Sequence, residues 1–473
     1  MQIEAFVLDG LGHQSYLIRD EKRGQAAVVD PRRDGEVYLE AASRSGASVT
    51  HILETHVHND YVTGARELAA RTGATIVASS EAHLAYPHQP VRDGETFRVG
   101  ELHFEVMSTP GHTPEHVSYV LFEPDQSTPH AVFSGGSMLA GGAGRTDLLG
   151  PGMTLTLTRQ QYHSLRKMLA TLPGHVTVYP THGAGSFCQA NLGSARRTTT
   201  IREELLASPA VQADSEEAFV KQQLAGYTAY PRYYAHMHDI NQRGPAILGA
   251  LADPAPLAPH AVQQQLAASI PLIDGRKRDD FARAHVPGSL NIELDSSFGT
   301  YAGWILPFNT PLMLLIEDEE GRREAVVQLL RIGYEQTRGY LDGGIAGWQA
   351  AALPTSSFER IDLDTLHQRW QARGPLTIID VRRDDEWARG HIPGSLHFHI
   401  GDLPQDLASV PTDGPLALIC QSGYRSEIAA SILAASGREV SAVQGGVGDW
   451  LARGWPSSAG APPATQDALH IHP

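Results

Sequence analysis

The sequence is poor in cysteine and in basic residues. It contains only Cys188 and Cys420 among 473 residues, so a framework of several disulfides is excluded, as is typical of a protein from a reducing compartment. Its 37 Lys and Arg stand against 53 Asp and Glu, which gives a formal net charge of -16 at pH 7. Because nucleic acids and anionic membranes bind basic surfaces, we expect neither as a partner.

Long apolar runs are also missing. No segment approaches the roughly 20 apolar residues of a membrane-spanning helix. The opening MQIEAFVLDG has neither the basic nor the apolar region of a signal peptide. We therefore expect a cytoplasmic protein, and this composition is compatible with a homo-oligomer. The 46 Gly, 30 Pro and 41% hydrophobic residues indicate a loop-rich globular chain, whose length predicts about three domains.

An internal repeat organises the second half of the chain. Residues 272–292 read LIDGRKRDDFARAHVPGSLNI, and residues 378–398 read IIDVRRDDEWARGHIPGSLHF. In each copy short apolar strands alternate with helical stretches, which predicts a parallel sheet covered by helices on both faces. We expect four segments: an N-terminal domain with a helical extension, two repeat domains and a disordered tail, with bounds 1–254, 255–356, 357–460 and 461–473.

The first 200 residues follow a different pattern. Short apolar strands are each followed by loops rich in Gly, His or Asp, and we expect them at residues 26–29, 50–53, 103–107, 131–133 and 176–179. Two stretches have a helical pattern, at residues 81–88 and 157–172.

Cys420 ends an apolar strand in the sequence LALICQSGYRS. A thiol at such a strand-to-helix turn lies over the helix N-terminus, where free N–H groups and the helix dipole favour an anion. Arg425 adds a positive charge, and Gly423 allows the loop to turn its N–H groups inward. These features stabilise a thiolate or a persulfide. We predict Cys420 and Arg425 as catalytic residues and the four residues between them as substrate-binding: Gln421, Ser422, Gly423 and Tyr424.

Both repeats resemble the rhodanese family. The resemblance is carried by Asp380-x-Arg382, by the Gly390 to Gly394 turn, by the Cys420 loop and by Gly445-Gly446 before Trp450. The loop has four residues between Cys420 and Arg425, the shorter form that in this family implies sulfur transfer rather than phosphatase activity. In the first repeat we place Glu317 at the position of Cys420. That repeat is therefore expected to be non-catalytic.

Histidines and an aspartate follow several N-terminal strands. THVHNDY brings His56, His58 and Asp60 at alternate positions, and later strand ends bring His112 and His182. Such side chains gathered from strand ends form open metal sites. His116 and His163 lack this pattern, and we expect no metal role for them.

This region resembles the metallo-β-lactamase family over roughly residues 1–200, through these histidines, Asp60 and the Gly-His-Thr and Pro-x-His-Gly loops. The resemblance implies an αββα sandwich, followed here by two rhodanese-like α/β domains with parallel sheets. The Gly144-Arg145-Thr146-Asp147 segment and the fusion to two rhodanese repeats most resemble persulfide dioxygenases, with Arg145 as a substrate-binding residue. The family implies one transition metal, with Fe(II) favoured and Zn(II) compatible, on ligands drawn from His56, His58, Asp60, His112 and His182.

Two positions depart from the family pattern. Tyr61 stands where a histidine for a second metal is usual, and Gly136, in FSGGSM, stands where an aspartate ligand is usual. We expect weaker binding of one metal, and we expect Gly136→Asp to raise metal occupancy.

Three functions follow as expectations. The first is oxidation of a low-molecular-weight thiol persulfide to sulfite, coupled to sulfur transfer through a Cys420 persulfide that forms thiosulfate. The second is a glyoxalase II-like thioester hydrolase fused to a sulfurtransferase. The third is a metal-poor scaffold in which only the sulfurtransferase is active.

Overall fold

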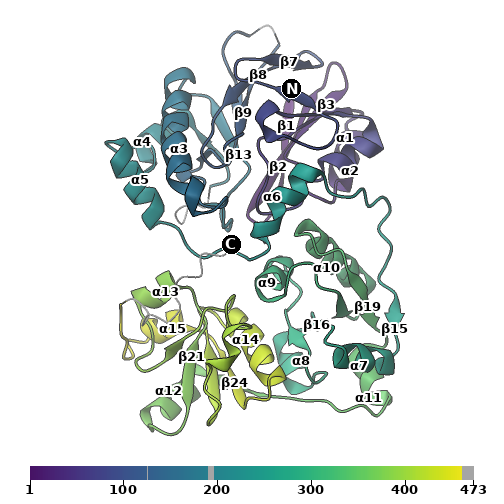
Figure 1. Ribbon diagram of the computed structural model, residues 1–473, viewed down its shortest axis with the longest axis vertical. Helices are drawn as coiled ribbons and strands as arrows, with labels where there is room; N and C mark the ends of the chain where they lie inside the picture. Colours follow the sequence, from purple (N-terminus) through teal and green to yellow (C-terminus); the bar gives the residue numbers. More distant parts are fainter. Residues whose placement is uncertain (125, 190–195, 461–473) are drawn as a thin grey trace. The chain divides into compact units, whose positions relative to one another are not determined.

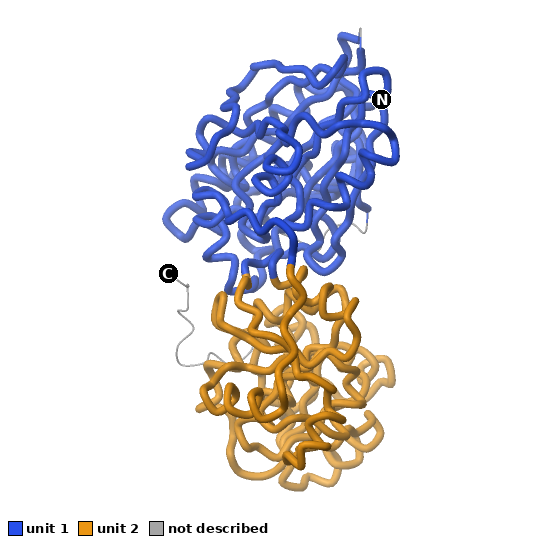
Figure 2. Tube along the Cα trace, turned by 90° about the vertical axis from the view of Figure 1, so that its right-hand side faces the viewer, with its two compact units in different colours: residues 1–251, 330–333, 471–473 blue, residues 252–329, 334–470 orange. Residues whose placement is uncertain are grey.

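The computed structural model describes residues 1–124, 126–189 and 196–460, so the predicted disordered tail, 461–473, lies outside the described residues. The chain forms two compact units (Figure 2). Unit 1 contains residues 1–251 with the short segment 330–333, and unit 2 contains the described residues 252–329 and 334–460. Within the described part of the chain, every helix is too short or too polar to cross a bilayer.

Two six-stranded sheets form the centre of unit 1 (Figure 1). The first sheet has, in spatial order, β1 (Gln2–Leu8), β2 (His13–Asp20), β3 (Gln25–Val29), β4 (Ser48–Leu53), β5 (Thr75–Ser79) and β6 (Gln89–Val91). The second sheet has β14 (Thr199–Thr200), β13 (Thr177–Pro180), β10 (Ala131–Gly135), β9 (Val117–Phe122), β8 (Leu102–Ser108) and β7 (Thr96–Val99). A small hairpin joins β11 (Met138–Leu139) to β12 (Gly142–Ala143).

Helices cover the outer face of each sheet. The unit contains α1 (Glu36–Arg44), α2 (Ala65–Thr72), the 3-10 turn η1 (Ser80–Ala82), α3 (Pro151–Thr171), α4 (Ile201–Ala207), α5 (Glu216–Ala225) and α6 (Tyr234–Arg243). Helices α1 and α2 pack on the first sheet, and α3 to α5 pack on the second. A third core fills the space between the two sheets, with Tyr16, Phe104, Tyr119 and Phe133 among its fully buried rings. This confirms the predicted αββα sandwich.

One helix expectation in this unit is wrong. Residues 81–88 form only the short turn η1 and then an irregular segment that leads into β6. His83 ends the turn in the left-handed conformation with φ 50°, and Pro87 has no N–H to donate to a helix. The apolar spacing of the segment arises because Ala82 and Tyr86 are buried although the backbone is not helical.

Unit 2 contains two five-stranded parallel sheets of identical strand order. The first has β15 (Pro256–Leu257), β19 (Thr337–Leu341), β18 (Leu312–Leu315), β16 (Leu272–Asp274) and β17 (Leu290–Asn291), with helices α7 (Pro259–Ala267), α8 (Arg278–Arg283), α9 (Phe298–Ile305), α10 (Glu319–Arg331) and α11 (Gly344–Ala350). The second has β20 (Glu359–Asp362), β24 (Val440–Gln444), β23 (Leu416–Ile419), β21 (Thr377–Asp380) and β22 (Leu396–His397), with α12 (Leu363–Gln371), α13 (Asp384–Arg389), η2 (Asp406–Ala408), α14 (Tyr424–Ala435) and α15 (Val447–Ala452). The sequence repeat is thus a structural repeat.

The repeated motif residues make the same contacts within each copy. Arg276 binds Asp274 at 2.6 Å, and Arg382 binds Asp380 at 2.7 Å, directly after the first long strand of each copy. Trp348 and Trp450 each donate Nε1–H to a proline carbonyl oxygen six residues later, at 2.8 Å. These motif residues are therefore part of the scaffold and explain why the repeat is recognisable outside the Cys420 loop.

Strand register corrects one assignment in the first repeat. Asp274 pairs with Leu315 on β18, and Asp380 pairs with Ile419 on β23. The residue that corresponds to Cys420 is therefore Ile316, and Glu317 corresponds to Gln421. The expectation that Glu317 occupies the nucleophile position is wrong by one residue, because both residues follow the same apolar strand. Ile316 is buried and aliphatic, so the first repeat still has no thiol at this position.

Candidate functional site

Loops from both sheets of unit 1 meet at one histidine cluster. His56 follows β4, His112 follows β8 and His182 follows β13. The backbone N–H of Val117 donates to the carbonyl oxygen of Thr55 at 2.8 Å, which joins a strand of the second sheet to the His56 loop. All three histidines are buried. One ring nitrogen of each lies within 4.8 Å of the others, a spacing that one metal ion can bridge.

Nδ1 of each of these histidines has a polar neighbour, which is a hydrogen-bond partner for His56 and His112 and a carboxylate contact for His182. Thr55 has one hydroxyl hydrogen, which it donates to Asp30 at 2.8 Å, so its oxygen accepts Nδ1–H of His56, also at 2.8 Å. His112 Nδ1 donates to the carbonyl oxygen of Arg145 at 2.7 Å. His182 Nδ1 lies 3.2 Å from the carboxylate of Asp60. Each ring therefore turns Nε2 toward the centre of the cluster.

Burial and charge suit these histidines to metal binding. Burial, together with the neighbouring histidines, holds the pKa of His56 and of His112 well below the usual value, so both rings are neutral and keep a lone pair for a metal. Burial raises the pKa of Asp60, but His182 beside it outweighs that effect and holds the pKa below its usual value. A buried carboxylate next to a ligating imidazole is the arrangement that orients metal-bound histidine.

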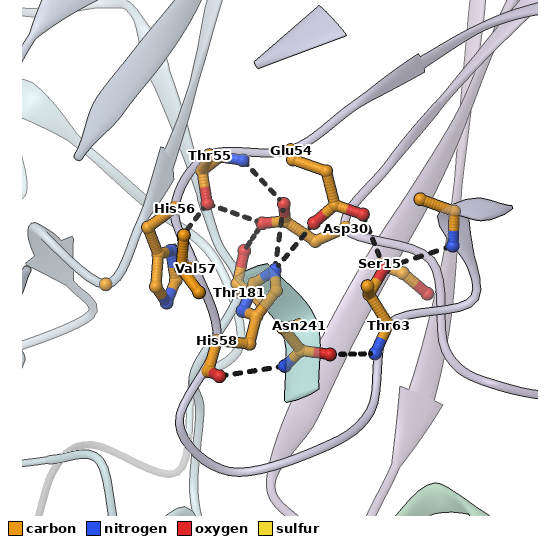
Figure 3. A network of polar contacts seen from close by, with 12 residues as sticks. Ser15, Asp30, Glu54, Thr55, His56, Val57, His58, Thr63, Thr181 and Asn241 are labelled. Atoms are coloured by element: carbon orange, nitrogen blue, oxygen red, sulfur yellow. Dashed lines mark hydrogen bonds and ion pairs between the residues drawn. The ribbon is translucent and has the colours of Figure 1, made fainter. Parts of the chain in front are cut away.

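His58 faces a pair of buried carboxylates (Figure 3). Its Nε2 lies 3.1 Å from Glu54 and 3.3 Å from Asp30. Burial lowers the pKa of His58, but the two carboxylates raise it, to about 10. Asn241 on α6 holds this loop by donating to the carbonyl oxygens of His58 and Tyr61, both at 2.8 Å. His58 thus compensates the charge of Asp30 and Glu54.

Asp30 and Glu54 were not among the residues singled out in the sequence. Asp30 accepts from Thr55 and Thr181, and Glu54 accepts from Thr63. Asp30 directly follows the apolar strand β3 and has φ 49°. Its position directly after a strand is the sequence feature that could have identified it as a site residue. Together with His58 the two carboxylates form a polar network beside His56 (Figure 3).

Gly136 lies directly against the ring of His112. A Cβ at this position would lie 2.2 Å from Cδ2 and 2.6 Å from Cγ of His112. The ring of His112 therefore occupies the space that an aspartate side chain would need, and the expectation that Gly136→Asp raises metal occupancy does not fit this geometry. His116 supports the turn, since its Nε2 accepts from the N–H of Gly136 at 3.0 Å and its Nδ1 contacts Thr109 at 2.9 Å.

The remaining predicted residues of unit 1 have internal partners. The Arg145 guanidinium is buried, donates twice to Asp147 at 2.7 Å and lies over the rings of Tyr227 and Tyr230. Its backbone carbonyl oxygen, which accepts from His112, is its contact with the cluster. Tyr61 donates its hydroxyl to the carbonyl oxygen of Asp30 at 3.1 Å. His163 is exposed and lies 2.9 Å from Glu216.

In unit 2, Cys420 lies between β23 and α14. Its Sγ accepts from the N–H of Gly423 at 3.1 Å, and Gly423, with φ 93°, forms the cap of α14. The carbonyl oxygen of Cys420 accepts from Val447 at 2.9 Å. A Cβ on Gly446 would lie 1.8 Å from the carbonyl oxygen of Gln421, so the loop is closely packed against the start of α15. Gln421 and Ser422 are exposed at the rim of the loop.

Arg425 is fixed by a carboxylate. Its guanidinium binds both oxygens of Glu386 on α13, at 2.6 and 2.7 Å. Burial raises the pKa of Glu386, but Arg425 outweighs this effect and lowers the pKa to about 2. The first repeat also reaches this area, because the hydroxyl of Tyr424 donates to the carbonyl oxygen of Glu293 at 3.0 Å and the ring of Tyr301 lies 5.0 Å from that of Tyr424.

Known proteins resemble the two units separately. Residues 8–182 match the metallo-beta-lactamase superfamily, and residues 258–351 and 362–453 each match the rhodanese-like domain. A hydroxyacylglutathione hydrolase of Rhodospirillum rubrum is 34% identical over 205 residues, 43% of this chain and 73% of that protein. The mitochondrial persulfide dioxygenase of Homo sapiens is 30% identical over 212 residues, 44% of this chain and 74% of that protein.

A solved structure extends the resemblance beyond the first domain. The crystal structure of a metallo-beta-lactamase from Staphylococcus aureus subsp. aureus COL aligns with 72% of this chain and 98% of that chain, with a TM-score of 0.63 and 29% sequence identity. The fold and the buried histidine cluster together imply a bound metal ion. The chain therefore belongs to the metallo-beta-lactamase superfamily and carries two rhodanese-like domains C-terminal to that domain.

Proposed function

We propose that the chain is an enzyme of sulfide and persulfide detoxification with two coupled reactions. In unit 1 a low-molecular-weight thiol persulfide is oxidised: one persulfide, one dioxygen and one water give one thiol, one sulfite dianion and two protons. In unit 2 Cys420 transfers sulfane sulfur and forms thiosulfate from that sulfite. The substrates are then small sulfur compounds.

The transfer step follows from the chemistry of a thiolate. The Cys420 thiolate attacks the outer sulfur of a persulfide, the S–S bond of the donor breaks, and the donor leaves as a thiolate. Sulfite next attacks the outer sulfur of the Cys420 persulfide. The new S–S bond gives thiosulfate, and Cys420 returns to the thiolate without net oxidation or reduction.

One observation carries the proposal for unit 2: Cys420 Sγ accepts from Gly423 N–H at the N-terminus of α14. A helix N-terminus stabilises a negatively charged sulfur, whether thiolate or persulfide. Arg425 places a guanidinium in the first turn of the same helix, and Glu386 holds that guanidinium in position. The exposed Gln421 and Ser422 leave the rim of the loop open to a small donor.

In unit 1, His56, His112 and His182 would hold the metal, and Fe(II) is favoured because it supplies a binding position for dioxygen and substrate. The chain's own residues orient the three rings and surround them with buried side chains, which excludes bulk water from the reacting sulfur. The relatedness to a persulfide dioxygenase supports this reaction.

Thioester hydrolysis is the second candidate, favoured by the similarity to a hydroxyacylglutathione hydrolase. Hydrolases of this kind imply two metals, which need further ligands at positions 61 and 136. Here Tyr61 has its hydroxyl on the carbonyl oxygen of Asp30, and Gly136 has no side chain. The donor set therefore favours oxidation at a single ion. A metal-poor scaffold with only the sulfurtransferase active is the third candidate.

Two assays on the purified full chain test these functions. Sulfur transfer from thiosulfate to cyanide should be abolished in Cys420→Ser, whereas the buried thiol variant Cys188→Ser should transfer at the wild-type rate. Oxygen uptake with glutathione persulfide should equal sulfite formation, and a hydroxyacylglutathione thioester should not be hydrolysed. Near-native transfer by Cys420→Ser would refute the nucleophile assignment. Thioester hydrolysis without oxygen uptake would favour the hydrolase.

A further inference from the structure

We propose that unit 1 binds one metal ion through an all-nitrogen set, the Nε2 atoms of His56, His112 and His182. In this set His112 fills the space of the missing carboxylate, and Asp60 is a positioning residue for His182. The inference deepens the proposed function of unit 1, but it concerns the ligands and not the reaction, so its test does not depend on turnover.

The hydrogen bonds at Nδ1 determine where the lone pairs are. His56 donates Nδ1–H to the hydroxyl of Thr55, and His112 donates Nδ1–H to the carbonyl oxygen of Arg145. Nδ1 of His182 faces the carboxylate of Asp60. These hydrogen bonds leave Nε2 of His56 and of His112 as the nitrogen that carries the lone pair. His112 Nε2 is buried and has no hydrogen-bond partner among the described residues. A buried nitrogen lone pair without a donor is costly, which indicates a missing cation.

The distance between two of these nitrogens supports the same conclusion. His56 Nε2 and His182 Nε2 lie 3.4 Å apart. Two ring nitrogens at this distance either share one proton in a hydrogen bond or bind one cation between them. The contact of His182 Nδ1 with Asp60 favours the cation, because a proton on Nδ1 leaves the lone pair on Nε2. Two nitrogens that each bind one tetrahedral ion at about 2.1 Å are separated by roughly 3.4 Å. The observed spacing is therefore that of two ligands on one ion.

Gly136 makes this ligand set possible. The ring of His112 lies where a Cβ would be, 2.2 Å from Cδ2. A carboxylate at position 136 and the present position of His112 exclude each other sterically. Glycine in place of aspartate at position 136 therefore does not leave the site without a third ligand. It exchanges a charged oxygen ligand for a site of three neutral nitrogens.

His58 lies outside this set. Its Nε2 already contacts both Glu54 and Asp30. His58 belongs to two candidate metal groups, one with Asp30 and His56 and one with Asp60 and His182, and neither group contains His112. A second ion on His58 would need either His182 or His56, both of which the first ion already uses. The geometry therefore predicts one ion per chain. Because three neutral ligands leave its charge of +2 uncompensated, the ion favours an anionic substrate such as a thiolate or persulfide anion.

Metal content and spectroscopy test the ligand set without turnover. Apo full-length protein is titrated with Co(II) and then analysed for bound metal, and its visible absorption reports the coordination number. His182→Gln and His112→Gln should lose more than the ~10–100-fold in affinity that outer partners contribute. The loss of Co(II) affinity in Asp60→Asn should lie within that range of ~10–100-fold. His58→Gln keeps a donor for Glu54 and Asp30, and it should still bind one ion, as should the exposed control His163→Gln.

The pair Gly136→Ala and Gly136→Asp is decisive. Both add the same Cβ against His112, so both should weaken Co(II) binding, with far-UV circular dichroism checking that the apo domain is folded. If Asp tightens binding while Ala weakens it, a carboxylate is the missing ligand and the proposal is wrong. Two tightly bound ions per chain, or loss of the ion in His58→Gln with retention in His182→Gln, would also overturn it. If the position-136 variants do not fold, His182→Gln, His112→Gln and His58→Gln decide alone.

Discussion

The close approach of Gly446 to the Cys420 loop gives a sharp test of the sulfurtransferase site. In Gly446→Ala the new Cβ would lie 1.8 Å from the carbonyl oxygen and 2.1 Å from the carbonyl carbon of Gln421. Real side chains keep Cβ at least 3.0 Å from such atoms, so backbone must move by roughly 1 Å. Overpacking of this kind costs about 1–3 kcal/mol of stability.

The displaced segment is the one that holds the nucleophile. Gln421 follows Cys420, and Val447 donates to the carbonyl oxygen of Cys420. A displacement of ~1 Å in a reacting group can lower a rate about 100-fold. We therefore expect sulfur transfer to fall by roughly that factor while most of the domain remains folded at 25 °C.

The assay is thiosulfate–cyanide transfer combined with thermal unfolding. The matched control is Gly374→Ala, because position 374 lies in the same domain, would have no atom within 4 Å of the added methyl group and has no positive φ. The control should retain both rate and stability. If Gly446→Ala transfers sulfur at the wild-type rate with an unchanged melting temperature, the close packing of this loop does not position Cys420, and the reasoning fails.

Two further variants concern unit 2. Glu317→Ala should leave the transfer rate and stability unchanged, because Glu317 is exposed in the repeat without a thiol; a large loss of transfer would contradict the non-catalytic role of that repeat. In Glu386→Gln the ion pair with Arg425 is lost. Since the folded pKa of Glu386 is about 2 against an ordinary value of 4.5, the pair contributes at most about 3 kcal/mol above pH 5, and this contribution disappears as the pH falls toward 2. Urea unfolding of both proteins should therefore show a difference at pH 7 that shrinks at pH 3, and a difference independent of pH would be inconsistent with this assignment.

The sequence by itself determined the architecture. Its repeat is visible because Asp380, Arg382 and Trp450 have the same scaffold contacts as their counterparts in the first copy, so both copies keep the same residue types. The histidines at strand ends predicted the cluster for a related reason. A metal ligand has to be a particular residue type directly after a strand, and that pattern is readable along the chain.

Only the tertiary structure decided what these residues do at their positions. Ring orientation separates His56, His112 and His182 from His58, and it depends on Asp30, Glu54 and Arg145, which are remote in sequence from most of the rings that they hold. The role of Gly136 was likewise hidden, because a glycine in a sequence does not reveal which side chain fills the space beside it. The register between β18 and β16 likewise showed that Ile316, and not Glu317, occupies the position equivalent to Cys420. Residue types are a property of the chain, whereas the partner of each side chain is decided by how distant segments pack.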